Sequence, residues 1–271
     1  MAIKIGFLGS GNMAKALMQG LLKNKTKASS IFAFDVDSKK LKNLKSQLKI
    51  NTCSKAEELL EKSNIVILAT KPQDLKAALQ NLKSHFTKQI VISIAAGVDL
   101  ATLSKQLPTS CKLLRSMPNN PALIGEGITA LFSKNRLSSQ EKKVVESVFT
   151  GSGEVLWVDN EDQLDAVTGL SGSGPAYVYQ FVKALTQGGV KQGLAHKTAY
   201  ILALKTLLGA ALTLQKTGQS PEVLIPLVTS KKGTTLEGLN VLRKRKFDQT
   251  LIETVAAATR RAREIKKELK D

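Results

Sequence analysis

A short apolar segment that runs into a glycine turn and then into a helical pattern constrains this chain most. Residues 3–8 have the pattern of a buried strand, and Gly9-Ser10-Gly11-Asn12-Met13-Ala14 opens a segment with helical spacing. There Gly9 makes a tight turn, Gly11 lets backbone N–H groups approach a ligand, and small Ala14 lets helix and strand pack closely. A helix N-terminus also favours negative charge. The segment predicts a dinucleotide site with the pyrophosphate on this turn; a purely structural glycine turn is the alternative.

Strand patterns alternate with helical patterns over the first part of the chain. The expected strands lie at 3–8, 31–34, 65–69, 90–94, 113–114, 128–132 and 155–158, and the expected helices at 12–24, 38–48, 55–62, 74–83 and 138–149. After Trp157 only helical patterns follow, near 161–188, 195–216, 220–229, 235–244 and 248–269. Alternation of this kind is typical of a doubly wound, mostly parallel sheet. We expect an α/β fold, with a dinucleotide-binding Rossmann domain at 1–160 and an all-α domain at 161–271.

The most apolar stretch of the second half is 200–214, and Lys205 and Gly209 interrupt it. We interpret it as a buried helix rather than a membrane span. Helices that are apolar nearly all round need a covering partner, so we expect the all-α domain to form a homodimer. Packing within one chain is the alternative.

The composition fits a soluble cytoplasmic protein. The chain has 271 residues, of which 42% are hydrophobic, and Cys53 and Cys111 are its only cysteines. Two cysteines are too few for a disulfide scaffold or a cysteine metal cluster, and we expect no metal. The N-terminus lacks the basic flank and apolar stretch of a signal peptide. We therefore expect a reducing, cytoplasmic location.

The formal net charge of +18 raises the question of nucleic-acid binding. However, lysines are spread through most helices, and aromatic residues make up only 4% of the chain, which provides no surface for stacking bases. The densest runs, at 243–246 and 260–270, read as solvated helix faces. We expect no nucleic-acid partner, and a positive field would instead attract an anionic cofactor and substrate.

Three further loops follow expected strands at the sheet edge that carries the glycine turn. They are Thr70-Lys71-Pro72, Ala95-Ala96-Gly97 and the segment at 115–122. Because an open sheet binds its ligand beyond the carboxyl ends of its strands, these loops predict a shared nicotinamide cleft, with ordinary loops as the alternative.

Asp35 ends the second expected strand, where an acid accepts hydrogen bonds from the adenosine ribose. It favours NADH over NADPH. Lys39 and Lys40 would instead suit a 2′-phosphate, and a third reading is that Asp35 caps the next helix, a role for which Asp37 and Ser38 compete.

Two segments of the all-α half are rich in small and hydroxyl residues. Residues 168–176 interrupt a helical pattern with glycines, which indicates close approach of a ligand or backbone. Residues 228–236 lead into a helix whose N-terminal N–H groups would suit a carboxylate. A threonine N-cap without a ligand is the alternative reading of the second segment.

Taken in order, these motifs resemble the Δ1-pyrroline-5-carboxylate reductase family over essentially the whole chain. The most specific are the segments at 169–177 and 230–235. The resemblance implies a Rossmann domain, an interleaved helical dimerisation domain with a decamer as a further assembly, and reduction of a cyclic imine to L-proline by NADPH or NADH in the last step of proline biosynthesis.

The resemblance also implies site residues. The cofactor would be bound by Gly9, Ser10, Gly11, Asn12, Met13, Asp35, Ala69, Thr70, Lys71, Pro72, Ala95, Ala96 and Gly97. The substrate would be bound by Ser173, Gly233, Thr234 and Thr235. Thr235 would be catalytic, through a hydrogen bond to the ring nitrogen.

The chain departs from the family pattern at three places. Lys232 stands where glycine is usual, Asn120 replaces a threonine, and Ile225-Pro226 replaces a Lys-Asp pair. These departures concern the substrate loop and the loop at 115–122, so they bear on substrate binding more than on the fold.

Reduction of a C=N bond explains why the sequence has no strong acid–base constellation, since the imine is already electrophilic and needs mainly alignment. A related layout, the β-hydroxyacid dehydrogenases, needs a catalytic lysine, and Val178 occupies that position here. That class and a non-enzymatic protein that senses the cofactor or binds nucleic acid are the alternatives.

Overall fold

The computed structural model describes residues 3–269, which form two compact units. One unit contains the residues up to Ser173 together with those from Ala256 onward, and the other is Gly174–Val255. The last helix of the chain therefore starts in the second unit and ends in the first. The sequence predicts that the all-α part begins after residue 160, whereas the division between the two units falls after residue 173. The two boundaries differ.

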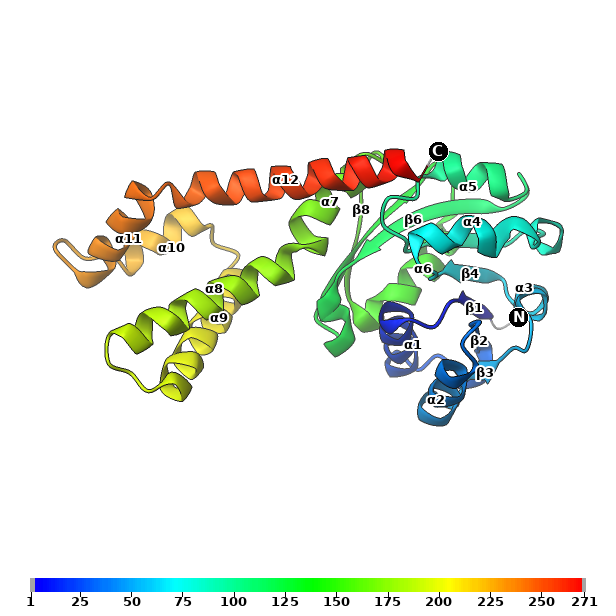
Figure 1. The fold of residues 1–271 in the computed structure, drawn as a ribbon, viewed down its shortest axis with the longest axis horizontal. Coiled ribbons are helices and arrows are strands. Elements are labelled where there is room, and N and C mark those ends of the chain that lie inside the picture. Colours follow the sequence, from blue (N-terminus) through cyan, green and yellow to red (C-terminus); the bar gives the residue numbers. More distant parts are fainter. Residues whose placement is uncertain (1–2, 270–271) are drawn as a thin grey trace. The chain divides into compact units, whose positions relative to one another are not determined.

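The first unit is built on an eight-stranded sheet in the order β3-β2-β1-β4-β5-β6-β7-β8 (Figure 1). The strands are β1 (Ile5–Leu8), β2 (Ile31–Phe34), β3 (Asn51–Thr52), β4 (Ile65–Leu68), β5 (Ile90–Ser93), β6 (Lys112–Pro118), β7 (Gly127–Ser133) and β8 (Gly153–Trp157). Of the pairs described within residues 3–269, β6 with β7 is antiparallel and the others are parallel. The expected α/β class with a mostly parallel sheet is confirmed. The two-residue β3 was not expected.

Helices cover both faces of this sheet. They are α1 (Asn12–Lys23), α2 (Ser38–Leu48), α3 (Ala56–Lys62), α4 (Pro72–Gln80), α5 (Leu100–Gln106), α6 (Ser139–Phe149) and α7 (Gln163–Val167). Successive strand residues point to opposite faces. Thus Ile65 and Ile67 pack in the core under α1, α2 and α6, while Val66 and Leu68 pack in the core under α3, α4 and α5. This arrangement makes the sheet doubly wound.

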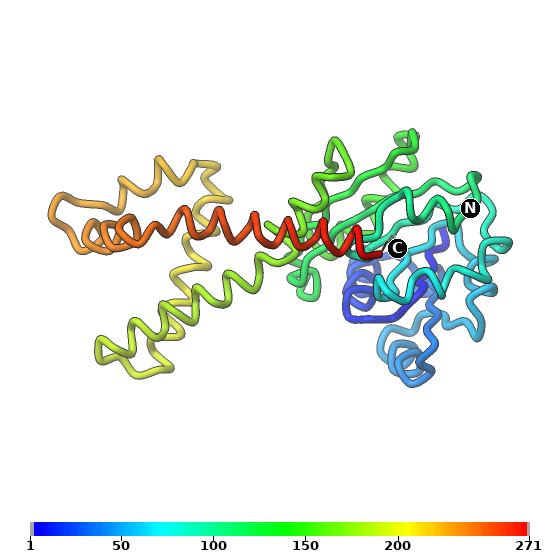
Figure 2. The backbone as a smooth tube through the Cα atoms, turned by 45° about the horizontal axis from the view of Figure 1, so that its top comes forward, coloured from blue at the N-terminus to red at the C-terminus, as the bar shows by residue number. Residues whose placement is uncertain are grey.

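The second unit is entirely helical. Its helices are α8 (Gly174–Lys191), α9 (His196–Thr217), α10 (Pro221–Leu227), α11 (Thr234–Lys244) and the first part of α12 (Phe247–Glu268). Helices α8 and α9 pack side by side (Figures 1 and 2). Of residues 174–255, only Val182, Thr186, Ala199 and Ala203 are buried.

The alternative that packing within one chain covers residues 200–214 is wrong. Tyr200, Ile201, Leu204 and Leu208 of α9 are all more than a third exposed. The physical reason is that α8 covers only the face carrying the small Ala199 and Ala203.

Within residues 3–269, α9 is also the one helix long and apolar enough to cross a membrane by length and composition, which alone is weak evidence for a span.

Candidate functional site

The carboxyl ends of four parallel strands are aligned at one edge of the sheet. Leu8 of β1 pairs with Phe34 of β2 and with Leu68 of β4, and Leu68 pairs with Ser93 of β5. The loops that follow these strands therefore leave from the same edge. The strand order reverses between β1 and β4, and this switch point is where open α/β sheets bind ligands.

The glycine turn has the geometry that the sequence predicts. Gly9 has φ of +103°, and a Cβ there would lie 2.6 Å from the carbonyl oxygen of Ala69. Gly11 is the N-cap of α1, no side chain caps it, and a Cβ there would meet nothing within 4 Å. Asn12 and Met13 begin the helix, whose first turn contains no acid. An uncapped helix N-terminus beside open space suits a phosphate group.

Thr70 adds an independent observation at this edge. Its hydroxyl oxygen is buried and has no hydrogen-bond partner within the described residues. Buried polar atoms are nearly always paired, because an unpaired one costs free energy. Next to it, Lys71 is the N-cap and Pro72 the first residue of α4, again without a side-chain cap. A ligand with polar groups at this edge would satisfy these atoms, so the residues present fit a dinucleotide.

Asp35 follows β2 and is bound to the glycine turn. Its Oδ2 accepts hydrogen bonds from the backbone N and the hydroxyl of Ser10, both at 2.7 Å, and its Oδ1 accepts one from the backbone N of Asp37 at 2.9 Å. Burial alone would raise the pKa of Asp35, but these hydrogen bonds outweigh it and hold the pKa below its ordinary value. The helix cap is Asp37, whose side chain accepts from two backbone N–H groups at the start of α2. The reading of Asp35 as that cap is therefore wrong.

The loop after β5 is fixed on one side. Gly97 has φ of +77°, and a Cβ there would lie 2.7 Å from Cγ2 of Ile265 in α12. The contact with α12 therefore explains the glycine at 97 without a ligand. Ala95 is buried, whereas Ala96 is half-exposed.

The end of β6 and the loop that follows it contact the glycine-rich segment that begins the helical half. Residues Thr168–Gly172 form a π-helical turn between α7 and α8. A Cβ at Gly172 would lie 2.6 Å from Cε of Met117, and the side-chain amide of Asn119 donates to the hydroxyl of Ser171. Close approach of another chain segment thus explains this glycine. Ser173 ends the turn, and Asn120 starts the short helical turn Asn120–Ile124.

The substrate-loop candidates lie in the second unit. Gly233 is the N-cap of α11, which begins with Thr234 and Thr235, and no side chain caps this helix. The alternative of a threonine N-cap is therefore wrong. Lys232, where the family has glycine, adopts a left-handed backbone with φ of +58°. At position 232 this chain therefore has the left-handed backbone conformation that favours glycine, although the residue there is a lysine. Pro226 lies near the end of α10.

A charged cluster at the end of the sheet was not recognised in the sequence. Arg115 of β6 is buried, and its guanidinium lies 3.0 Å from Oε1 of Glu161 and 3.8 Å from Oδ1 of Asp165. The Nζ of Lys266 in α12 lies 2.7 Å from Asp162 and 3.4 Å from Asp165. In the sequence, Arg115 directly follows Leu113 and Leu114 of an expected strand, and this position could have indicated a buried ion pair. Its partners lie at least 46 residues away in the sequence.

The fold and this sheet edge define a Rossmann-type dinucleotide-binding oxidoreductase with a second, helical unit. Residues 4–97 match the family model described as NADP oxidoreductase, coenzyme F420-dependent, and residues 161–265 match the one described as pyrroline-5-carboxylate reductase dimerisation.

Relatives extend the similarity to nearly the whole chain. Pyrroline-5-carboxylate reductases of Arabidopsis thaliana and Methanosarcina acetivorans are 37% and 38% identical to it, over 97% of this chain and 96% and 98% of theirs. Among solved structures, the Coxiella burnetii reductase has a TM-score of 0.92 at 34% identity, covering 98% of this chain and 99% of that one. The Plasmodium falciparum reductase with NADP bound has a TM-score of 0.86 at 32% identity, covering 97% and 98%. The chain belongs to the pyrroline-5-carboxylate reductase family.

Proposed function

We propose that this protein reduces Δ1-pyrroline-5-carboxylate to L-proline with NADH or NADPH, as the last step of proline biosynthesis. The observation that carries the proposal is the 37–38% identity, over 97% of the chain, to reductases named for this substrate. The uncapped helix N-terminus beside Gly11 and the unpaired hydroxyl of Thr70 support a dinucleotide at the sheet edge.

The cofactor-binding residues lie on the loops of that edge. In this proposal the backbone of residues 9–13 holds the pyrophosphate at the N-terminus of α1. Ala69, Thr70, Lys71 and Pro72 line the nicotinamide side together with residues 95–97. Thr70 donates its hydroxyl hydrogen to the ligand, and Ala96 offers the exposed side of its loop. Gly97 contributes through its backbone, because α12 occupies the space beside its Cα.

The substrate-binding residues are Gly233, Thr234, Thr235 and Ser173. The free N–H groups at the start of α11 bind the substrate carboxylate, as helix N-termini bind anions. The hydroxyl of Thr235 makes a hydrogen bond to the ring nitrogen. Its own pKa is too high for it to act as a general acid, so water supplies the proton.

When bound, the dinucleotide supplies the hydride that reduces the C=N bond. The chain's own residues align the two rings, hold the carboxylate and exclude other orientations. Alignment and electrostatic stabilisation are sufficient for an imine that is already electrophilic, and this accounts for a site without an acid–base pair.

NADH is the proposed preferred cofactor. Asp35 is ionised at neutral pH, because its hydrogen bonds keep its pKa below the ordinary value. Its Oδ1 has a single described partner, the backbone N of Asp37, and so retains a lone pair for a ribose hydroxyl. A 2′-phosphate beside this carboxylate would be repelled. The Plasmodium falciparum relative holds NADP. A comparison of NADH with NADPH therefore tests whether this chain has the preference that Asp35 suggests.

The working form is a cytoplasmic homodimer, with a decamer as its further assembly. The match to a dimerisation model over residues 161–265 and the exposed apolar side chains of α8 and α9 support the dimer. In a dimer, a second copy covers α9, and no membrane is needed to explain its apolar surface.

Steady-state reduction of pyrroline-5-carboxylate with each cofactor tests the proposal. We expect turnover with both cofactors and a higher kcat/KM with NADH. A strong preference for NADPH would contradict the role of Asp35 alone. The function itself would be contradicted by a protein that binds neither NADH nor NADPH, does not reduce the imine, and binds DNA in physiological salt.

A further inference from the structure

The last turns of α12 close one side of the proposed cofactor site, within the first unit. The red C-terminal end of α12 lies beside α4 and α5 in Figures 1 and 2. Ile265 and Leu269 lie one turn apart on the same face of the helix. Ile265 fills the space next to Gly97, and Leu269 packs on the core under α3, α4 and α5. The loop after β5 therefore has a wall made by the end of the chain.

A charged cluster attaches the same turns to the segment before α7. The amine of Lys266 lies 2.7 Å from Oδ1 of Asp162 and 3.4 Å from Oδ2 of Asp165. Asp165 is only 2% exposed. Burial alone would lower the pKa of Lys266, but the two aspartates outweigh it and raise the pKa, so the amine is charged at neutral pH.

The cluster continues to the loop after β5. Glu161 uses one oxygen, Oε1, to accept both from the guanidinium of Arg115 at 3.0 Å and from the backbone N of Leu100 at 2.7 Å. Leu100 is the first residue of α5, three positions after Gly97. The loop is thus held at Gly97 by Ile265 and at Leu100 by Glu161, and Lys266 and Arg115 both lie within 4 Å of Asp165.

From these contacts we infer that Lys266 and Ile265 are positioning residues for the dinucleotide. Ile265 lies against Gly97, and Lys266 acts through Asp162 and Asp165. Ile265 and Lys266 fix the loop at 95–97 in the conformation that leaves Ala96 exposed toward the proposed cofactor, and so lower the cost of ordering it on binding. The inference rests on the proposed function, since it assumes that this loop contacts a dinucleotide.

The balance of charge explains why Lys266 matters. Three carboxylates, those of Glu161, Asp162 and Asp165, face the cations of Arg115 and Lys266. Without the amine of Lys266, the cation within residues 3–269 that still lies within 4 Å of the buried Asp165 is the guanidinium of Arg115, at 3.8 Å. An undercompensated buried charge is costly, and the segment relaxes to reach solvent. That relaxation would loosen both attachments of the loop.

The test is the dissociation constant of the intact protein for NADH and for NADPH, measured by nucleotide fluorescence without imine. For Lys266→Met we expect both constants to rise roughly three- to thirtyfold, the range seen when a residue acts on a site through intermediate contacts. In kinetics, the KM for the dinucleotide should rise while the KM for the imine stays within about twofold. Amide hydrogen exchange at 95–100 should become faster.

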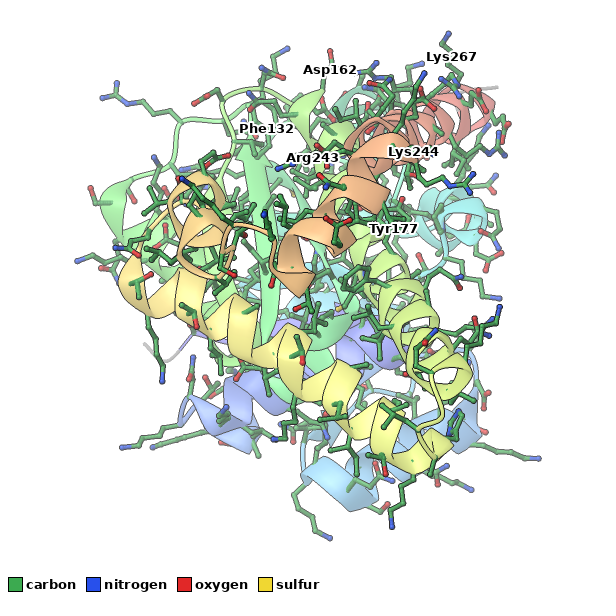
Figure 3. The ribbon with its side chains drawn as sticks, turned by 90° about the vertical axis from the view of Figure 1, so that its left-hand side faces the viewer. Phe132, Asp162, Tyr177, Arg243, Lys244 and Lys267 are labelled. Atoms are coloured by element: carbon green, nitrogen blue, oxygen red, sulfur yellow. The ribbon has the colours of Figure 1, made fainter. Side chains whose placement is uncertain are left out.

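Two matched variants separate positioning from general loss of charge. Lys266→Arg keeps a cation that reaches both aspartates, and it should restore binding to within about twofold of the parent. Lys267 is exposed and has no ion pair within residues 3–269, and Figure 3 shows it near the upper edge of the view, as it does Asp162. Lys267→Met removes an equal charge one residue away and should leave binding within about twofold of the parent.

Ile265→Ala keeps the inference testable if Lys266→Met does not fold. It empties the space beside Gly97 without changing charge and should weaken binding in the same direction. Folding of each variant is checked by its thermal transition. Parent-like dissociation constants for both variants, or an equal loss in Lys267→Met, would overturn the inference while leaving the function intact. A parent protein that binds neither dinucleotide would overturn both.

Discussion

Ser10 joins the glycine turn to the acid after β2 through two hydrogen bonds to one carboxylate oxygen of Asp35. At the scale of single residues this contact fixes the carboxylate of Asp35, which is proposed above to bind the ribose. Burial raises the pKa of Asp35, but the hydrogen bonds from Asp37 and Ser10, together with the nearby charge of Lys40, lower it below its ordinary value.

Ser10→Ala tests this contact through its pH dependence. A carboxyl whose pKa is lowered on folding stabilises the fold above its unfolded pKa, and this stabilisation is lost as pH falls through the folded value. We expect the variant to lose about 1 kcal/mol at neutral pH, the value of a typical hydrogen bond. The difference in Tm from the parent should narrow below about pH 4, the ordinary range of aspartate.

The matched control is Ser104→Ala, because the hydroxyl of Ser104 donates to a backbone carbonyl, that of Ala101, and no acid is involved. Its effect should not change with pH. A constant Tm difference for Ser10→Ala down to pH 3 would show that Asp35 does not carry the effect.

Thr235→Ala tests the proposed catalytic hydroxyl. We expect kcat for imine reduction to fall about 100-fold, as when one donor to a developing charge is removed. The dissociation constant for the dinucleotide should stay unchanged, and Thr235→Ser, which keeps the hydroxyl, should retain most of the activity. Parent-level turnover in Thr235→Ala would exclude the assigned role.

At the scale of helices and turns, four lysines adopt a backbone that favours glycine. Lys25, Lys49, Lys232 and Lys246 all have φ between +54° and +64°. Lys49 is the C-cap of α2, and its N–H donates to the carbonyl of Lys45. A left-handed cap costs a side-chain-bearing residue about 1 kcal/mol more than glycine.

Lys49→Gly should therefore stabilise the first unit by about 0.5 kcal/mol, after the greater entropy of glycine in the unfolded chain is subtracted. Lys45→Gly is the matched control. It removes the same charge from inside the same helix and should destabilise by about 1 kcal/mol. Both are measured by urea denaturation of the whole protein. Destabilisation by Lys49→Gly would mean that the charge or stem of the lysine outweighs its backbone strain.

Periodicity predicted most of these elements and missed the short β3 and α5. The patterns at 31–34 and 38–48 match β2 and α2. In contrast, β3 has two residues, too few to show a period, and the seven-residue α5 was missed although the equally short α3 was predicted. The glycine turn could be predicted because its function depends on neighbours in sequence. The neighbours of Gly97 and Gly172 could not, because Ile265 and Met117 approach them from distant parts of the chain.

At the scale of the whole molecule, the second unit lacks a core of its own. Four buried residues among 82 cannot hold a stable helical unit in water. Leu208→Arg on the exposed face of α9 should therefore convert the assembly to smaller species with little activity, as measured by light scattering after size-exclusion chromatography.

Lys216→Glu, at the exposed C-terminal end of the same helix, is the control and should leave the assembly intact. A Leu208→Arg protein with the parent's mass in solution would show that α9 is not covered by a second copy.

The division of the chain also fixes an order of events during synthesis. The unit that begins the chain is completed by residues from Ala256 onward, after all of Gly174–Val255 has been made. Since chains emerge from the ribosome N-terminus first, Gly97 cannot contact Ile265 until residues 174–255 have been made. In a nascent chain, the nucleotide-binding unit is therefore completed only after the helical unit has been made and can pair with another copy.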